Sequence, residues 1–428
     1  MNLRDLRVIS AEPLLVPPAN MHPTEFFTRR RFLTRGSLAA AALSAAPSLT
    51  GAQPVRSANS RISIGMIGTG SRGSALMREA LALAPKHNIA ITAVCDVWKK
   101  NREGAFAAVT GSGGTAPQQF TRYEELLTRK DNDAVVIATP DFSHGRILLA
   151  ALQAGKDVYI EKPMTIDIES ADKALQLARA TGRVVQTGTQ RRSNGHFIKA
   201  AKLIASGELG HLSRVSAAMN VNAARWMRRV DDCRREDVDW DAFTLGKLAP
   251  AFDARLLRCW QLYRATSNGL PGLWMTHYAD AVHLLTGAKY PQSVVTLGGN
   301  YVWHDGREHA DTMHTVLEYP EGFLFNWSMG LGNAAGVHFT LHGTKATLDA
   351  ERWTLTAENS KELPAKIAAE RNGSHLENWL ECLRSRARPN ADIEVGFQHV
   401  VATVMAATAL ETGRRQKWDA ARREMVSA

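Results

Sequence analysis

A glycine-rich turn is the first group of residues whose types and spacing fit a chemical task. It reads Gly68, Thr69, Gly70, Ser71, Arg72 and Gly73. An apolar run, residues 61–67, precedes it, and a stretch with helical spacing of apolar residues, 74–84, follows it. In such a unit the first glycine permits a tight turn, the second lets the backbone approach a pyrophosphate, and the third lets helix and strand pack closely. The phosphates would lie at the helix N-terminus. The turn therefore predicts a dinucleotide site, although glycine-rich turns also arise by chance.

An acidic residue follows at a distance that suits ribose binding. Asp96 ends a second apolar run, residues 89–95, and lies 26 residues after Gly70. A carboxylate there accepts hydrogen bonds from both ribose hydroxyls and repels a 2′-phosphate, which favours NAD. Basic residues among positions 99–102 leave NADP open. The alternative is that Asp96 only caps the next helix.

Lys162 is the residue best suited to move a proton. It follows a strand-like run, residues 157–160, and Thr139 and Pro140 follow residues 133–138 in the same way. Side chains at the carboxyl ends of parallel strands face the cofactor crevice, where desolvation lowers the pKa of a lysine. Such a lysine can exchange a proton with a substrate hydroxyl while hydride moves to the nicotinamide. The alternative is a solvated lysine at the end of a strand.

The elements that must position these residues follow from the hydrophobic pattern. Strand-like and helical stretches alternate through residues 61–187, which predicts a parallel, doubly wound sheet and a Rossmann dinucleotide-binding domain. Residues 312–318, 323–328 and 337–342 instead alternate apolar and polar side chains between turn signals, as strands do. We therefore predict an α/β protein whose second domain is residues 188–428. A single core rarely grows beyond about 250–300 residues, so the length agrees with two domains.

Several motifs together resemble the Gfo/Idh/MocA oxidoreductase family. Besides the glycine turn and Asp96, they are Thr139-Pro140 with His144, Glu161-Lys162-Pro163, and residues 186–191. The resemblance extends from about Ile62 to about Asp419. It implies an NAD(P)-dependent enzyme acting on CH–OH groups, and a C-terminal α/β domain with an open, mainly antiparallel sheet that often forms dimers or tetramers.

The resemblance also implies roles for individual residues. Lys162 is the catalytic lysine, and Glu161 and Pro163 shape the turn that carries it. The expected cofactor contacts are the glycine turn with Asp96, Thr139, Pro140, His144, Glu161, Lys162, Gln190 and Arg191.

A second family motif holds a histidine between two aspartates. His277 and Asp280 match it, while Leu273 replaces the first aspartate. On a helix His277 and Asp280 face the same way, so Asp280 could orient the imidazole. Leu273 puts the lysine–aspartate–histidine relay in doubt, and His277 would supply more of the acid–base work. The alternative is a buried structural histidine.

Aromatic and arginine side chains precede this motif. Trp226, Arg258 and Tyr263 could stack on and hydrogen-bond a sugar ring, or they could simply pack against the sheet. No His, Cys, Asp or Glu spacing matches a metal template, so no metal is expected.

The N-terminal residues 1–60 read as an export signal and linker. Arg29 and Arg30 precede Phe32 and Leu33, and a weakly apolar stretch follows that is too short to span a membrane. This is similar to a twin-arginine signal, which implies export of the folded protein to the periplasm. An ordinary secretory signal and a cytosolic start are the alternatives.

The net charge is +10, but the basic residues are scattered pairs, so nucleic acid is not an expected partner. We predict an oxidoreductase acting on a sugar or polyol with a tightly held nicotinamide nucleotide. No nicotinamide pool exists outside the inner membrane, so its cycle would be redox-neutral. An NAD-dependent glycosidase is the competing enzyme class, and a non-catalytic nucleotide-binding protein is a third alternative.

Overall fold

The computed structural model describes residues 60–248 and 251–427. The predicted export signal, with Arg29 and Arg30, lies outside these residues and stays a prediction.

The first sheet has six parallel strands. They are β1 (Ile62–Ile67), β2 (Ile89–Cys95), β3 (Gln118–Phe120), β4 (Ala134–Ile137), β5 (Asp157–Ile160) and β6 (Val185–Thr187). Their order in the sheet is β3-β2-β1-β4-β5-β6. The strand order reverses between β1 and β4, and in open sheets of this kind ligands bind beyond the carboxyl ends at that point. The predicted Rossmann domain is therefore confirmed, and its crevice lies beside the glycine turn.

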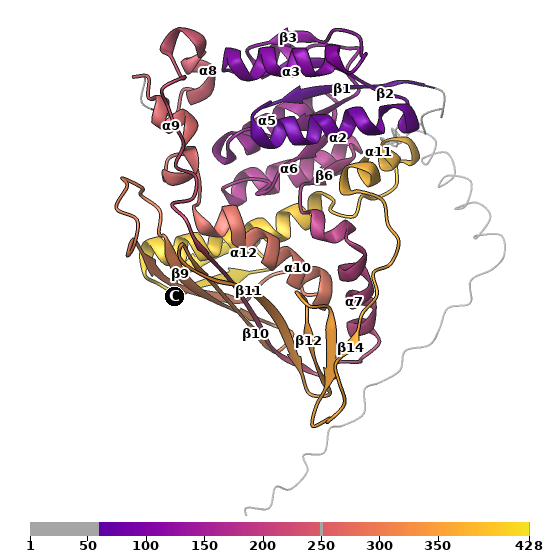
Figure 1. Cartoon of the computed structure of the whole chain (residues 1–428), viewed down its shortest axis with the longest axis vertical. Helices are drawn as coiled ribbons and strands as arrows, with labels where there is room; N and C mark the ends of the chain where they lie inside the picture. The colour runs from indigo at the N-terminus through magenta and orange to yellow at the C-terminus, as the bar shows by residue number, and fades with distance from the viewer. Residues whose placement is uncertain (1–59, 249–250, 428) are drawn as a thin grey trace, which may run out of the picture. The chain divides into compact units, whose positions relative to one another are not determined.

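Helices cover both faces of this sheet, as parallel strands require (Figure 1). They are α2 (Ser71–His87), α3 (Lys99–Gly111), α4 (Tyr123–Leu127), α5 (Asp141–Gln153) and α6 (Ile168–Thr181). One further helix, α11 (His375–Ser385), comes from far along the chain and joins the core of the first sheet. Its Trp379 packs edge-on against Tyr159 of β5, with 5.8 Å between ring centroids.

The second sheet has ten strands and is mixed, with all pairs antiparallel except β7 with β10. The strands are β7 (Leu212–Asn222), β8 (Ser293–Gly299), β9 (Thr312–Tyr319), β10 (Phe323–Gly330), β11 (Gly332–Gly343), β12 (Ala346–Asp349), β13 (Thr354–Ala357), β14 (Ala365–Lys366), β15 (Gln416–Asp419) and β16 (Glu424–Ser427). Buried and more exposed residues alternate along β9 and β10, as the sequence pattern predicts.

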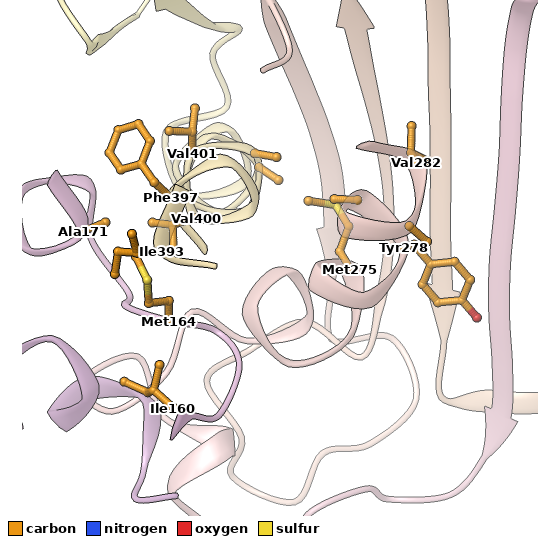
Figure 2. Packing of buried hydrophobic residues seen from close by; sticks show 14 of the residues in the cluster. Ile160, Met164, Ala171, Met275, Tyr278, Val282, Ile393, Phe397, Val400 and Val401 are labelled. Carbon is orange, nitrogen blue, oxygen red and sulfur yellow. The ribbon is translucent and has the colours of Figure 1, made fainter. Parts of the chain in front are cut away.

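Three helices cover one face of the second sheet: α7 (Gly195–Ala205), α10 (Thr276–Thr286) and α12 (Ile393–Thr412). Helix α12 also packs against α6 and β6, so it joins the two sheets. In Figure 2, Phe397 and Met164, which lies just beyond β5, are on one side of α12, and Met275, just before α10, is on the other. By length and composition α12 could span a membrane, but 67% of its apolar window is buried in the protein.

Candidate active site

A cavity of about 730 Å³ opens at the carboxyl ends of β1, β4 and β5. Residues of both sheets' domains line it. The predicted site residues on its wall are Gly68, Gly70, Ser71, Arg72, Asp96, Thr139, Pro140, His144, Glu161, Lys162, Gln190, Trp226, Arg258 and His277. The structure therefore brings together most of the residues that the sequence singles out, although they lie up to 209 positions apart in the chain.

The glycine turn has the space that a dinucleotide needs. Gly68 has a φ of +82°, and a Cβ added to Gly73 would lie 2.0 Å from the Gly68 carbonyl oxygen, so Gly73 is required for the close packing of the turn. A Cβ at Gly70 would meet only the Asn101 side chain, at 3.6 Å, and its φ of −63° suits any residue. The protein itself does not need a glycine at position 70. The residues present fit a bound pyrophosphate, for which Gly70 leaves room.

Asp96 follows β2 and lies beside the glycine turn. Its Oδ2 accepts a hydrogen bond from the Thr69 amide at 2.8 Å, and its Oδ1 accepts one from the Trp98 amide at 2.9 Å. Thr69 thus holds Asp96 in place and does not itself line the cavity. Oδ2 also accepts from the Thr69 hydroxyl and the Asn101 amide, each at 3.3 Å, and the side chain lines the cavity, where ribose hydroxyls would donate to it.

Lys162 extends from the end of β5 into the cavity, where its Nζ donates to the Leu273 carbonyl oxygen at 2.8 Å. Leu273 belongs to a π-helical turn, Pro271–Met275, just before α10. The residue that replaces the family aspartate therefore still contacts the lysine, through its main chain. Desolvation lowers the pKa of Lys162, and the negative charges of Asp141 and Glu161 oppose that shift. A lysine in this state can release a proton more readily than a solvated one.

Asp141 is a site residue that the sequence reasoning missed. It is the first residue of α5, it is 2% exposed, and Ser267 Oγ donates to its Oδ2 at 3.3 Å. Burial raises the pKa of Asp141 to about 7, against the opposing influence of Lys162. The available signal was its place directly after Thr139-Pro140, at the carboxyl end of β4.

His277 lies on the same cavity wall, near the indole of Trp274. Desolvation, and then the positive charges of Lys162 and Arg191, hold the pKa of His277 well below its ordinary value. The imidazole is therefore neutral at pH 7, and it can accept or donate a hydrogen bond. This does not support the expectation that His277 carries more of the proton transfer in place of the missing aspartate. The pKa of Lys162 is also lowered, and that of Asp141 is raised to about 7.

Two further residues connect the turns around the cavity. His144 lies between the carbonyl oxygens of Thr139 and Pro163, at 2.8 and 2.7 Å, and burial lowers its pKa to about 4. Glu161 accepts a hydrogen bond from Arg72 at 2.7 Å. These contacts tie the β4 turn, the β5 turn and the glycine turn together, so Lys162 is held by its neighbours on several sides.

Besides Thr69 and Gly73 of the glycine turn, Arg191, Tyr263 and Asp280 also do not line the cavity. The Arg191 guanidinium lies over the Tyr278 ring, 4.3 Å from its centroid, so it packs within the second domain. Tyr263 is half-buried beside Arg255, outside the cavity wall. Arg191 and Tyr263 are close in sequence to the lining residues Gln190 and Gln261, and for Tyr263 the structure agrees with the packing alternative.

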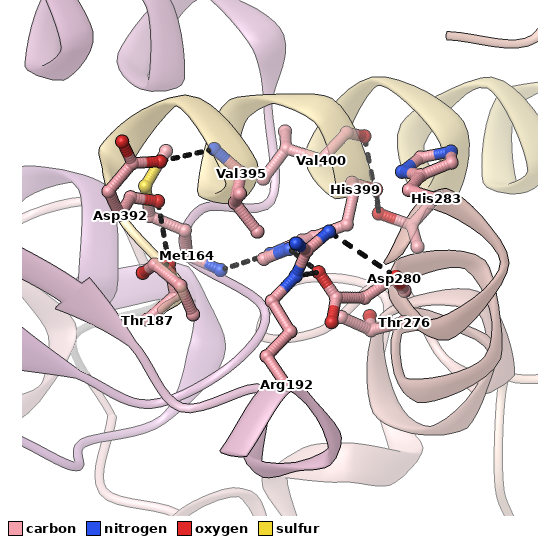
Figure 3. A network of polar contacts seen from close by, with 12 residues as sticks. Met164, Thr187, Arg192, Thr276, Asp280, His283, Asp392, Val395, His399 and Val400 are labelled. Atoms are coloured by element: carbon pink, nitrogen blue, oxygen red, sulfur yellow. Dashed lines mark hydrogen bonds and ion pairs between the residues drawn. The ribbon is translucent and has the colours of Figure 1, made fainter. Parts of the chain in front are cut away.

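The predicted role of Asp280 is wrong. Its Oδ1 accepts a hydrogen bond from Arg192 Nε at 2.8 Å, in a nearly fully buried ion pair, and lies 3.9 Å from His399 Nδ1 (Figure 3). Asp280 therefore does not orient His277. His399, from α12, accepts a hydrogen bond at Nε2 from the Met164 amide at 3.4 Å. The network supports the turn that follows Lys162.

This network predicts a stability effect at His399. In His399→Leu the buried Met164 amide loses its acceptor, which costs about 1–3 kcal/mol. We expect denaturant unfolding to show a loss in that range. His399→Gln, which restores an acceptor, should recover part of it, and equal losses in the two variants would contradict the assigned contact.

The Lys162–Asp141 pair predicts a pH effect. Since Asp141 opposes the lowering of the Lys162 pKa, Asp141→Asn should lower that pKa further. The rising limb of a kcat/KM profile for alcohol oxidation, which reports the neutral lysine, should then move to lower pH. The control Asp131→Asn removes an exposed carboxylate, bonded to Arg129 at 2.9 Å, and should leave the profile unchanged.

The substitution Asp141→Asn should also change how the stability of the protein depends on pH. The pKa of Asp141 is about 7 in the folded protein, above its ordinary value near 3.8. The wild type therefore loses stability as the pH rises from about 4 to about 7, because over this range the unfolded chain releases a proton that the folded protein keeps. Asp141→Asn should lack this loss, which thermal unfolding at pH 5 and pH 8 would measure. A wild type that shows no greater loss than the variant between these pH values would contradict the shift.

A segment of the second domain, residues 226–248, contributes to the cavity lining; we call it the strap. The Asp239 amide donates to the Val97 carbonyl at 2.9 Å, and Trp98 pairs with Val238 as a β-bridge. Phe243 packs edge-on against Phe142, with 5.6 Å between centroids. The strap is thus joined to the β2–α3 loop and to α5.

No group of three or more His, Cys, Asp and Glu side chains that could hold a metal ion occurs in residues 60–248 and 251–427. The cavity has the glycine turn on one wall and aromatic and arginine side chains on the other.

Comparison with known proteins agrees with this geometry. Residues 62–189 match the oxidoreductase family with an NAD-binding Rossmann fold, Gfo/Idh/MocA, and residues 249–417 match the C-terminal alpha/beta domain of that family. A glycosyl hydrolase family 109 protein of Saccharopolyspora erythraea is 32% identical over 59% of this chain. The matched region covers 61% of that relative's length.

Two solved structures share the fold. One is the WlbA dehydrogenase from Bordetella pertussis in complex with NADH and UDP-GlcNAcA (TM-score 0.65, 18% identity, 85% of this chain and 99% of that one). The other is an aldose-aldose oxidoreductase from Caulobacter crescentus (TM-score 0.65, 18% identity, 84% and 100%). Since both family domains are matched in order around one cavity, the chain belongs to the Gfo/Idh/MocA oxidoreductase family and carries its NAD-binding Rossmann domain.

Proposed function

We propose that the protein oxidises and reduces a sugar or polyol at a hydroxyl-bearing carbon, with a nicotinamide nucleotide that stays bound through the cycle. The observation that carries this is Lys162, held in the cavity by the Leu273 carbonyl, with Asp141 near it and the glycine turn beside it. The nicotinamide, when bound, supplies the hydride chemistry.

The chain's own residues would handle the proton. Lys162, with its lowered pKa, takes the proton from the substrate hydroxyl and returns it in the reverse direction. Asp141 stabilises the protonated lysine, and neutral His277 holds the substrate hydroxyl by a hydrogen bond. The aromatic side chains of Trp226 and Trp274 exclude water from the sugar face.

The strap supports retention of the nucleotide. Its contacts to Val97, Trp98 and Phe142 would have to open before a dinucleotide in the crevice could leave. Ligands covered in this way exchange slowly, because dissociation needs a conformational change. Asp96 on the ribose side favours NAD over NADP.

A retained nucleotide suits the proposed export through a twin-arginine signal. An enzyme in the periplasm meets no nicotinamide pool, so we propose a redox-neutral net reaction in which one sugar is oxidised and another reduced. The similarity of the fold to that of an aldose-aldose oxidoreductase supports this form.

A second candidate is an NAD-dependent glycosidase. The similarity to a glycosyl hydrolase family 109 protein favours it. Transient oxidation at C3 would acidify the C2 proton, the aglycone would be eliminated, and water addition and reduction would restore the sugar. The same lysine and bound nucleotide would serve both reactions.

We also propose a homo-oligomer. The face of the second sheet that the helices leave open exposes Leu297 (79%), with Leu324 and Val295 also exposed. Apolar side chains gathered on one sheet face are typical of an interface.

One experiment tests the two proposed reactions together. Purified protein is denatured and any released nucleotide is identified by mass; intact protein is incubated with pairs of sugars and with aryl glycosides. Bound NAD together with one oxidised and one reduced sugar supports the leading proposal. Release of aglycone without a net change in oxidation state supports the glycosidase. A protein that holds no nucleotide and takes up neither NAD nor NADP would overturn both.

A further inference from the structure

The part of the cavity wall formed by residues 226–277, here called the C-terminal wall, carries positive but no negative side chains. It is rich in aromatic side chains, including Trp226, Trp260 and Trp274. Its only side chains with a full charge at neutral pH are Arg228 and Arg258, and none of its described lining residues is acidic. All the acidic side chains on the cavity lining lie on the Rossmann side.

The two arginines are fixed by main-chain contacts to each other's segments. Arg228 Nη1 donates to the Arg258 carbonyl at 3.0 Å, and the Arg228 amide donates to Cys259 Sγ at 3.2 Å. Arg258 Nε donates to the Arg229 carbonyl at 3.1 Å. Desolvation and the neighbouring positive charge of Arg258 both lower the pKa of Arg228. Two like charges are thus held close together at an exposed edge of the cavity, where an anion could bind between them.

Arg228 lacks the carboxylate partner that other cavity arginines have. Arg72 pairs with Glu161 at 2.7 Å, and Arg122 pairs with Asp239 at 3.0 Å. Within the described part of the chain no carboxylate oxygen lies within 4.0 Å of the Arg228 guanidinium, and Arg258 reaches Asp232 only at 3.9 Å. The guanidinium donors of Arg228 other than the Nη1 donor bonded to Arg258 are therefore available to an external oxyanion.

The neighbouring backbone supports a binding role. Trp226, two positions before Arg228, has a φ of +67°, which is uncommon for a tryptophan. Strain of this kind is concentrated at ligand-binding positions. Two residues span at most about 7 Å, so a sugar ring against the Trp226 indole would bring a ring substituent within reach of Arg228.

We propose that Arg228, assisted by Arg258, binds an anionic group carried by the substrate, so that the preferred sugar is an acid or a phosphate ester. The inference rests on the proposed function and narrows its substrate class. The nucleotide's own phosphates are the other source of an oxyanion, but the glycine turn and the N-terminus of α2 receive those on the Rossmann side.

The test measures binding as well as turnover. Nucleotide-loaded protein is titrated calorimetrically with glucose, galactose, their uronic acids and their 6-phosphates. Wild type should bind at least one anionic sugar about 10–100-fold more tightly than the parent aldose, as a charged hydrogen bond allows. Arg228→Gln should remove this preference and leave the parent aldose and the nucleotide content unchanged. The control Arg229→Gln, next in the chain with its side chain on Asp231, should keep it.

The outcomes separate the possibilities. Uronates preferred over 6-phosphates identify a carboxylate, and the reverse identifies a phosphate. A wild type that prefers no anionic sugar overturns the inference, and so does an Arg228→Gln variant that retains the preference. Loss of nucleotide from Arg228→Gln overturns it too, by assigning the arginine to the cofactor's phosphates. The absorbance of the bound nicotinamide tests the proposed function separately. If no sugar in the panel changes this absorbance, the proposed oxidation and reduction of a sugar is wrong, whatever the binding preference.

Discussion

Replacing Lys162 by methionine is expected to lower turnover by about 10²–10⁴-fold while the protein keeps its nucleotide and its fold. Methionine approximates the length of the lysine but can neither take nor return a proton. The Leu273 carbonyl loses its donor, but it lies on the cavity and can be hydrated. Single-turnover absorbance of the bound nicotinamide, followed after addition of sugar, measures the effect on the chemical step.

A matched lysine controls for the loss of a buried ammonium. Lys156 is 5% exposed and donates to the Asn132 carbonyl at 2.8 Å, away from the cavity. Lys156→Met should lose stability but keep its turnover per folded, nucleotide-loaded molecule. Lys162→Met should keep its stability but lose turnover. Near-normal turnover in Lys162→Met would remove this lysine from the proton transfer.

The parts of the site that could be predicted from the sequence depend on local order. Strand, glycine turn and helix follow one another along the chain, and the carboxyl ends of parallel strands meet at one edge. Positions such as Gly68, Thr139 and Lys162 could therefore be placed in one crevice from the order of the residues alone. The second sheet was predictable for a similar reason, since alternation along β9 and β10 is local.

The parts that could not be predicted depend on contacts between distant segments. Asp280 and His277 share a helix face, but Arg192, 88 positions earlier, takes the carboxylate. The pKa of Asp141 depends on burial beneath Ser267 and on the nearby Lys162, which no spacing along the chain reveals. The strap reaches Val97 and Trp98 from more than 130 positions away. In each case the residue type is evident from the sequence, but its partner is not.

Gly70→Val is expected to yield a folded protein that has lost its nucleotide. The backbone at Gly70 has an ordinary φ of −63°, and a Cβ there would meet only Asn101, at 3.6 Å. The side chain would instead occupy the space that the glycine leaves for a pyrophosphate. Bound nucleotide per chain should fall at least about tenfold, a loss of about 1.4 kcal/mol in binding, with the circular dichroism spectrum unchanged.

Two other glycines separate loss of ligand from loss of fold. A Cβ at Gly73 would lie 2.0 Å from a main-chain oxygen, so Gly73→Val should damage the packing of α2 on β1 and lower the unfolding temperature of the nucleotide-free protein. Gly104 lies in α3 with nothing within 4 Å of an added Cβ, so Gly104→Ala should keep the nucleotide and gain about 0.5–1 kcal/mol of stability. If Gly70→Val keeps its nucleotide, the turn does not hold the phosphates. If Gly70→Val unfolds as Gly73→Val does, Gly70 is required for the fold. The phosphate-binding residues would then have to be identified elsewhere on the cavity wall.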